Sequence, residues 1–147
     1  MQFNYLTQQF YTKYNQCPEI LEKNTRPYLV KLIKIETLTY AIPMRTHINI
    51  KNKDCFITDH EKNSGLDFIK TVVLAKKEYI DTNKFAKIHQ SEYNYIKFSE
   101  FMIEKAFKKF VHDYRKDVER HKKNPTIPPN PRFQYCALQY FHKELKL

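Results

Sequence analysis

Apolar and polar residues alternate in two neighbouring stretches of the first half of the chain. Residues 28–35 are rich in β-branched and apolar side chains, which predicts a strand. In residues 38–44 every second side chain is large and apolar or aromatic, which predicts a second strand. Only Glu36 and Thr37 separate the two, so we expect an antiparallel hairpin. Pro43 cannot donate a ladder hydrogen bond and should mark a sheet edge or the end of its strand.

Shorter apolar runs on either side of this hairpin extend the predicted sheet. Residues 55–57 and 71–74 are two further strand candidates, and residues 78–80 are a candidate for a short fifth strand. Residues 18–23, which begin with Pro18, suit a short helix. The sheet should therefore be antiparallel and made of short strands.

Beyond residue 82 the apolar period changes from two to three or four residues, which predicts a long amphipathic helix. Residues 124–131 hold four prolines and predict an extended loop. Asn130 and Pro131 then supply an N-cap and a first-turn proline for a closing helix over residues 132–145. Together these elements predict one α+β domain over residues 1–147, with a long helix and a C-terminal helix packed around the sheet. The apolar face of the long helix comprises Ile96, Ile103, Phe107, Phe110, Tyr114 and Val118.

The net charge of the chain indicates what kind of partner it binds. The chain has 26 Lys and Arg against 16 Asp and Glu, a formal net charge of +10, which favours a polyanionic partner. No apolar run is long enough to span a bilayer, and the first ten residues do not resemble a signal peptide. Three widely spaced cysteines suit a reducing compartment rather than a disulfide framework or a zinc site. We therefore expect a cytoplasmic protein without membrane contact.

Several kinds of catalytic centre find no support in the sequence. Gly65 is the only glycine, so there is neither a phosphate-cradling glycine loop nor a serine-nucleophile elbow. The carboxylates are scattered, and only Asp67 has a distinctive setting, where it could cap a turn or pair with Lys70. One carboxylate does not make a two-metal site. We expect no metal and no cofactor.

The most informative polar run follows the second strand of the hairpin. Arg45 offers a planar fork for phosphate, Thr46 a hydroxyl donor, and His47 a group that exchanges protons near neutral pH. Arg26, held extended by the proline after it, could reach a phosphate near the first strand. These residue types suit cleavage of RNA by its own 2′-OH, without a metal. The alternative is a basic turn with a solvated histidine and a surface arginine.

Tyrosines and lysines elsewhere could bind the RNA chain. Tyrosines beside basic residues can stack on unpaired bases, although they can equally belong to the core, as we expect for Tyr5. The long helix carries a row of lysines opposite its apolar face, and Lys51 follows the polar run. The candidate RNA-binding residues are Tyr11, Tyr28, Lys51, Tyr93, Lys97, Lys105, Lys108 and Lys109.

Five segments, in this order and spacing, resemble the toxins of type III toxin–antitoxin systems, the ToxN/AbiQ family, and most closely its TenpN branch. They are Arg26-Pro27-Tyr28 and residues 40–46, 64–68, 93–96 and 138–145. The resemblance implies a metal-independent endoribonuclease that leaves 2′,3′-cyclic phosphate and 5′-hydroxyl ends, on a twisted antiparallel sheet like that of the Kid/MazF toxins. It also implies cellular or phage RNA as the substrate and inhibition by a small pseudoknot RNA, which the toxin processes from a repeated precursor. Toxin and pseudoknot RNA would form a closed hetero-oligomer with a role in defence against phage. No obligate protein partner is implied.

The resemblance also assigns roles to individual residues. Thr46 stands where founding members have a serine, Arg45 where they have a threonine, and Ile48 where they have a lysine. His47 or Lys51 would then take over proton transfer. The resemblance further places Arg26 at the basic position ahead of the first strand, and Tyr11 and Tyr93 at tyrosines that line the RNA groove.

Two other functions remain open from the sequence. A non-catalytic RNA- or DNA-binding module would use the same basic helix and tyrosines but would need no proton-transfer pair. A protein that binds an acidic protein partner would have no affinity for RNA.

Overall fold

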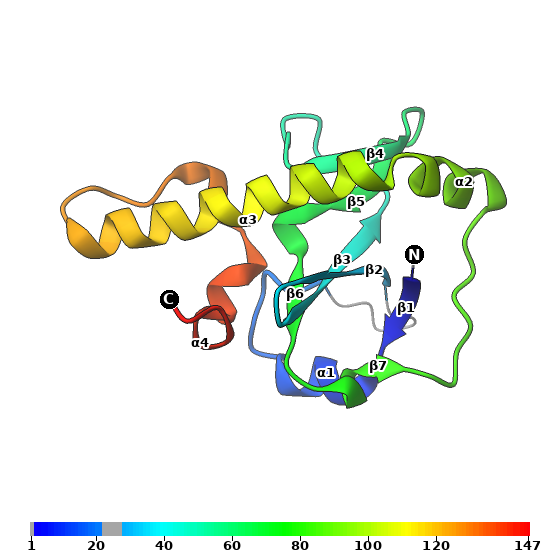
Figure 1. Ribbon diagram of the computed structural model, residues 1–147, viewed down its shortest axis with the longest axis horizontal. Coiled ribbons are helices and arrows are strands. Elements are labelled where there is room, and N and C mark those ends of the chain that lie inside the picture. The colour runs from blue at the N-terminus through cyan, green and yellow to red at the C-terminus, as the bar shows by residue number, and fades with distance from the viewer. Residues whose placement is uncertain (1, 22–27) are drawn as a thin grey trace.

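The computed structural model describes residues 2–21 and 28–147 (Figure 1). Arg26 lies outside the described residues, as do residues 22–23 of the predicted short helix. The described part of that helix, residues 18–21, forms an irregular turn instead. Among the described residues, no helix combines the length and the apolar character that crossing a membrane requires.

Seven strands of the described chain form one antiparallel sheet, which confirms the predicted α+β class. The strand order is β4-β5-β3-β2-β1-β7, and β6 pairs with β3 beside β5. The strands are β1 (Gln2–Leu6), β2 (Leu29–Ile35), β3 (Leu38–Arg45), β4 (Cys55–Asp59), β5 (Ser64–Asp67), β6 (Val72–Leu74) and β7 (Ile80–Asp81).

The β2–β3 hairpin forms as predicted. Ile35 lies opposite Leu38, so Glu36 and Thr37 make a two-residue turn, and Glu36 has a φ of 56°, as tight hairpin turns require. Pro43 lies inside β3 rather than at its end. It comes after the last pair with β6, at Ala41, and before the first pair with β5, at Met44. The proline, which has no N–H to donate, therefore lies where the pairing partner of β3 changes from β6 to β5.

Four α-helices lie around the sheet in the described chain: α1 (Gln8–Lys13), α2 (Gln90–Phe98), α3 (Glu100–Lys123) and α4 (His142–Leu145). The long apolar pattern predicted one helix, but Ser99 interrupts that helix and separates α2 from α3. In Figure 1, α3 crosses the sheet and extends well past it toward the loop that precedes the C-terminal segment.

One part of the core lies between the sheet and α3, and it continues to α1 and the C-terminal segment. The rings of Phe107 and Tyr40 meet edge to face, with centroids 5.3 Å apart, and Phe68 makes a similar contact with Phe107 at 5.4 Å. Ile103 and Phe110 on the same helix face are buried too. The predicted apolar face is thus confirmed, and burial of its large side chains is the main source of stability for so amphipathic a helix.

The predicted closing helix over residues 132–145 is wrong. The segment forms two 3-10 turns, η3 (Pro131–Phe133) and η4 (Ala137–Tyr140), before the short helix α4. The reason is that Cys136, Ala137 and Leu138 are all fully buried, and three consecutive residues cannot share one face of a helix. Asn130 does cap the segment, since its side chain accepts from the Arg132 N–H at 2.9 Å.

Candidate functional site

The candidate site begins at the end of β3, where Arg45 is held by a buried carboxylate. One Arg45 Nη lies 2.7 Å from Asp67 Oδ2, and the Asp67 side chain is 1% exposed. The other oxygen of Asp67 accepts hydrogen bonds from Asn52 Nδ2 and from the Ile69 N–H, each at 3.1 Å. With its lone pairs satisfied from three sides, Asp67 fixes the position of the arginine.

The lone glycine lies directly beside Arg45. Gly65 on β5 pairs with Arg45 on one side and with Ile57 on the other. A Cβ at Gly65 would come within 2.0 Å of the carbonyl oxygen of Phe56, so only glycine lets β4 approach β5 this closely. Its role is close approach between strands rather than a turn.

Arg45 and Thr46 open onto a surface hollow of about 550 Å³, which we call the Thr46 hollow. Distant segments of the chain build it, since Tyr28 stands before β2, Lys62 in the β4–β5 turn, and Lys87 and His89 ahead of α2. The polar residues that line it and matter here are Tyr28, Arg45, Thr46, Lys62, Lys87 and His89.

The two carboxylates of the Thr46 hollow are engaged with the protein itself. Asp59 accepts from the backbone N–H groups of Glu61 and Lys62, at 3.0 and 3.3 Å. Glu92 accepts from the Thr58 hydroxyl at 3.1 Å. Three cations also line the hollow. Arg45 is paired with Asp67, whereas Lys62 and Lys87 form no salt bridge with a described carboxylate and could contact a phosphate.

No protein-family model, curated protein or solved structure matches this chain. Its site must therefore be interpreted from its own residues. Within residues 2–21 and 28–147, no three His, Cys, Asp or Glu side chains gather as a metal site would require.

The three residues of the predicted run Arg45-Thr46-His47 do not share one place in the structure. Arg45 and Thr46 line the hollow, whereas His47 lines neither this hollow nor the one described below. His47 is exposed with a φ of 54°, and its N–H donates to the Lys62 carbonyl oxygen at 3.1 Å. This left-handed backbone turns the chain toward Ile48, which is buried.

His89 is a histidine that the sequence did not single out, and it does line the Thr46 hollow. It stands immediately before α2, and its carbonyl oxygen accepts from the Tyr93 N–H at 2.9 Å. Its side chain makes no cap hydrogen bond to that helix. The only sequence signal was its place four residues before Tyr93, at the expected start of a helix.

The predicted RNA-binding tyrosines have three different positions. Tyr28 lines the Thr46 hollow. Tyr93 is half-buried, and the centroid of its ring lies 6.3 Å from the centroid of the Phe3 ring. Tyr11 is only 6% exposed and belongs to the core beside Phe10. Its burial removes it from any groove for bases, which corrects the prediction.

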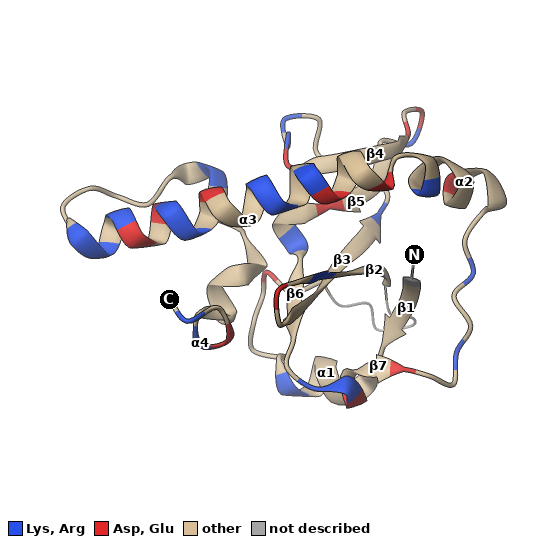
Figure 2. Cartoon of the chain, in the orientation of Figure 1, with Lys and Arg blue, Asp and Glu red and all other residues tan. Residues whose placement is uncertain are grey.

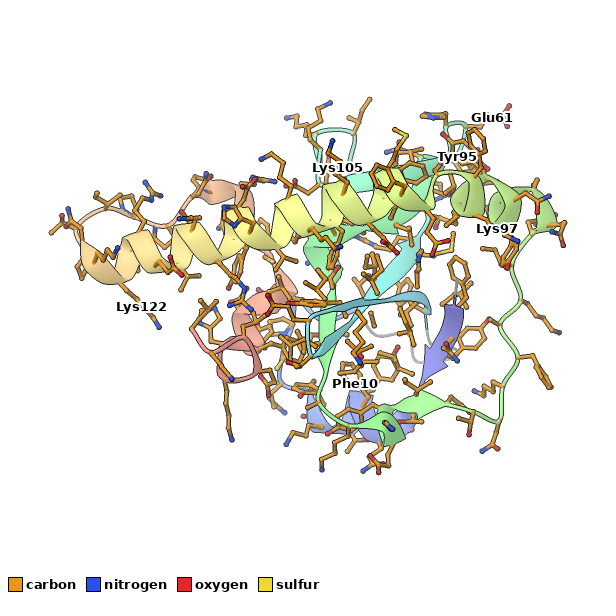
Figure 3. All side chains as sticks on the ribbon, viewed as in Figure 1. Phe10, Glu61, Tyr95, Lys97, Lys105 and Lys122 are labelled. Atoms are coloured by element: carbon orange, nitrogen blue, oxygen red, sulfur yellow. The ribbon has the colours of Figure 1, made fainter. Side chains whose placement is uncertain are left out.

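The predicted lysines of the helical region do not converge on either hollow. Lys97, Lys105, Lys108 and Lys109 are exposed on α2 and α3, and Lys109 pairs with Asp113 at 2.8 Å. Basic and acidic positions alternate along α3 to its far end (Figure 2). Figure 3 shows Lys105 and Lys122 well separated along that helix. Lys51, by contrast, does line a hollow, the second one beside Arg45.

Proposed function

We propose that the chain is a metal-independent endoribonuclease and that the Thr46 hollow is its active site. The observation that carries the proposal is the placement of Arg45. Buried Asp67 holds its guanidinium at the mouth of a hollow that also receives Thr46 and His89. A cation fixed in advance next to a hydroxyl donor and an imidazole is the set that phosphodiester cleavage by the 2′-OH needs.

In the proposed reaction the 2′-oxygen of the RNA attacks the adjacent phosphorus and the bond to the 5′-oxygen breaks. His89 accepts the proton of the 2′-OH, and protonated Lys62 or Lys87 supplies a proton to the leaving 5′-oxygen. Arg45 and the Thr46 hydroxyl stabilise the extra negative charge on the phosphorane. The products are a 2′,3′-cyclic phosphate and a 5′-hydroxyl, with no water consumed.

The resemblance to type III toxins gives this activity a setting, which is part of the same proposal. The sheet would be of the twisted Kid/MazF kind, and a small folded RNA would occupy the site as an inhibitor. The net charge of +10 supports RNA as the partner in both roles. Co-expression with the DNA directly upstream tests the setting, because a repeated antitoxin RNA encoded there would relieve growth arrest.

The activity itself is tested by incubating the purified protein with a long RNA in EDTA and mapping new ends. Arg45→Ala should lower the cleavage rate on the order of 10²–10³-fold, and His89→Ala on the order of 10²–10⁴-fold. His112→Ala is the matched control, because His112 is an exposed histidine on α3 that lines neither hollow. Cleavage at the wild-type rate by both Arg45→Ala and His89→Ala would refute this active site.

His47 remains the rival for proton transfer, since it was the histidine of the predicted run. If His47→Ala loses activity while His89→Ala retains it, the proton passes through His47 and the hollow serves binding alone. If the wild-type protein leaves the RNA intact but binds it, the chain is a non-catalytic RNA-binding module.

A further inference from the structure

Arg45 also lines a second hollow, of about 730 Å³, on which the proposed reaction does not draw. We call it the Lys70 hollow. Its walls come from the loop between β3 and β4, from the 3-10 turn η1 (Phe68–Lys70), and from the start of the C-terminal segment. The residues that the following steps use are Arg45, Lys51, Lys53, Lys70, Arg132 and Tyr135.

The carboxylates of the Lys70 hollow are neutralised by arginines. Asp67 is bound by Arg45. Asp54 receives two hydrogen bonds from Arg132, Nε to Oδ2 at 2.8 Å and Nη to Oδ1 at 2.6 Å. Three lysines remain, and in the described part of the chain none of them forms a salt bridge with a carboxylate. They are Lys51, Lys53 and Lys70.

These lysines are carried on backbone that is held in place. The side chain of Asn52, between Lys51 and Lys53, donates to Asp67 at 3.1 Å and accepts from the Asp54 N–H at 2.8 Å. Lys70 is half-buried, and this burial lowers the pKa of its ammonium group although Asp67 acts in the opposite direction. A bound phosphate would favour the charged form of this partly buried ammonium group.

An exposed aromatic ring accompanies the lysines. Tyr135 is 61% exposed, and its carbonyl oxygen accepts from Lys70 Nζ at 3.1 Å. Tyrosine beside lysines is the combination with which proteins bind single strands, the cations holding phosphates and the ring stacking on a base. An acidic peptide would engage the lysines but would leave the ring unexplained.

We propose that the Lys70 hollow binds the nucleotide of a single RNA strand that neighbours the one in the Thr46 hollow, with its phosphate on the lysines and its base on Tyr135. The inference rests on the proposed function. Because Arg45 borders both hollows, the strand passes over Arg45 from one to the other. The protein thus recognises at least one nucleotide beside the scissile phosphate.

The test measures binding of a short, mixed-sequence 2′-O-methyl RNA, which cannot be cleaved, at several salt concentrations. The triple variant Lys51→Ala/Lys53→Ala/Lys70→Ala removes three proposed phosphate contacts. In a plot of the logarithm of the binding constant against the logarithm of the salt concentration, the slope should become shallower by about 2. Each phosphate contact on a single strand contributes about 0.7 to that slope. The matched control is Lys116→Ala/Lys122→Ala/Lys123→Ala, which removes the same charge from the C-terminal half of α3, where Figure 3 labels Lys122.

An unchanged slope in the triple variant, or an equal change in the control, would overturn the proposal. The double variant Lys51→Ala/Lys53→Ala changes only exposed side chains and decides the matter if loss of Lys70 disturbs folding. Its slope should fall by about 1.4. Tyr135→Ala should weaken binding about tenfold at every salt concentration, without a change of slope.

These measurements distinguish a failure of the nucleotide site from a failure of the proposed nuclease activity. If the wild-type protein leaves ordinary RNA intact but the triple variant has the reduced slope, the nucleotide site stands and the nuclease does not. If the protein cleaves RNA and all three variants bind like the wild type, the nuclease stands and this site does not.

Discussion

One wall of the Thr46 hollow is the end of β3, and another is formed by residues 87–89, the end of the irregular segment ahead of α2. Arg45 in the first wall is held by strand pairing to Gly65 and by the buried carboxylate of Asp67. Lys87 and His89 in the second wall stand outside any strand pairing. The proposed phosphate-binding group is thus fixed by the sheet, whereas the proposed proton-transfer group depends on a few local contacts.

The two walls would therefore have different roles in the proposed reaction. A preset cation stabilises transition-state charge without reorganisation at the moment of reaction. A histidine on an irregular segment can adjust to the strand that enters the hollow. Changes in the β3 wall should therefore cost stability and activity together, while changes in the other wall should cost activity with little loss of stability.

The largest effect is expected where β4, β5 and Arg45 meet. Gly65→Ala places a Cβ against the Phe56 carbonyl oxygen, and backbone cannot yield as a flexible side chain would. The free energy of unfolding should fall by about 3 kcal/mol or more, at or beyond the usual range for overpacking. Urea denaturation measures it. Ser64→Ala is the control next door, because the buried Ser64 hydroxyl has no partner in the described chain and its removal should cost little.

A smaller loss is expected when Arg45 keeps its strand but loses its carboxylate. Asp67→Asn should lower the free energy of unfolding by about 2 kcal/mol, less than for a fully buried pair, because Arg45 is 28% exposed and can be hydrated. As a positioning residue, Asp67 should affect kcat for RNA cleavage more than KM. A double-mutant cycle with Arg45→Ala checks the link. Additive effects on kcat would mean that Asp67 acts on the fold alone.

The irregular wall should respond in the opposite way. Ile88, between Lys87 and His89, is half-buried against the core. Ile88→Ala should lower the free energy of unfolding by about 1 kcal/mol and the cleavage rate by about tenfold or more, because a displaced His89 loses its geometry. Ile80→Ala on β7, also half-buried, is the matched control and should cost similar stability with no loss of cleavage. Equal activity in the two variants would show that the irregular wall does not position a reacting group.

The two walls also differ in how far the sequence could predict them. Alternation over residues 38–44 and the two-residue link predicted the hairpin, and with it the place of Arg45 at a strand end. Spacing of three and four predicted the buried face of α3. These are local patterns, in which each residue's partner follows from its own period.

The rest depends on contacts between segments far apart in the chain, which a period does not encode. Gly65 stood out in the sequence only as the single glycine, because the atom that requires it, the Phe56 carbonyl oxygen, belongs to another strand. Asp67 was expected to cap a turn or pair with Lys70. It does cap η1, through the Ile69 N–H, but its salt bridge goes to Arg45 instead. His89 and Thr46 line the same hollow although 43 positions separate them, and no local pattern in the sequence predicts that they share it.

The smallest effect is a dependence of stability on pH that arises outside both walls, at His142. Burial, with Lys122 nearby, lowers the pKa of His142, whose Nε2 lies 2.6 Å from the Tyr114 hydroxyl oxygen. Below pH 6.5 the unfolded chain binds a proton that the folded chain resists, so stability falls as the pH drops toward the lowered pKa. His142→Gln should flatten the acid side of the curve of unfolding free energy against pH. An equally steep acid decline in this variant would show that another group causes it.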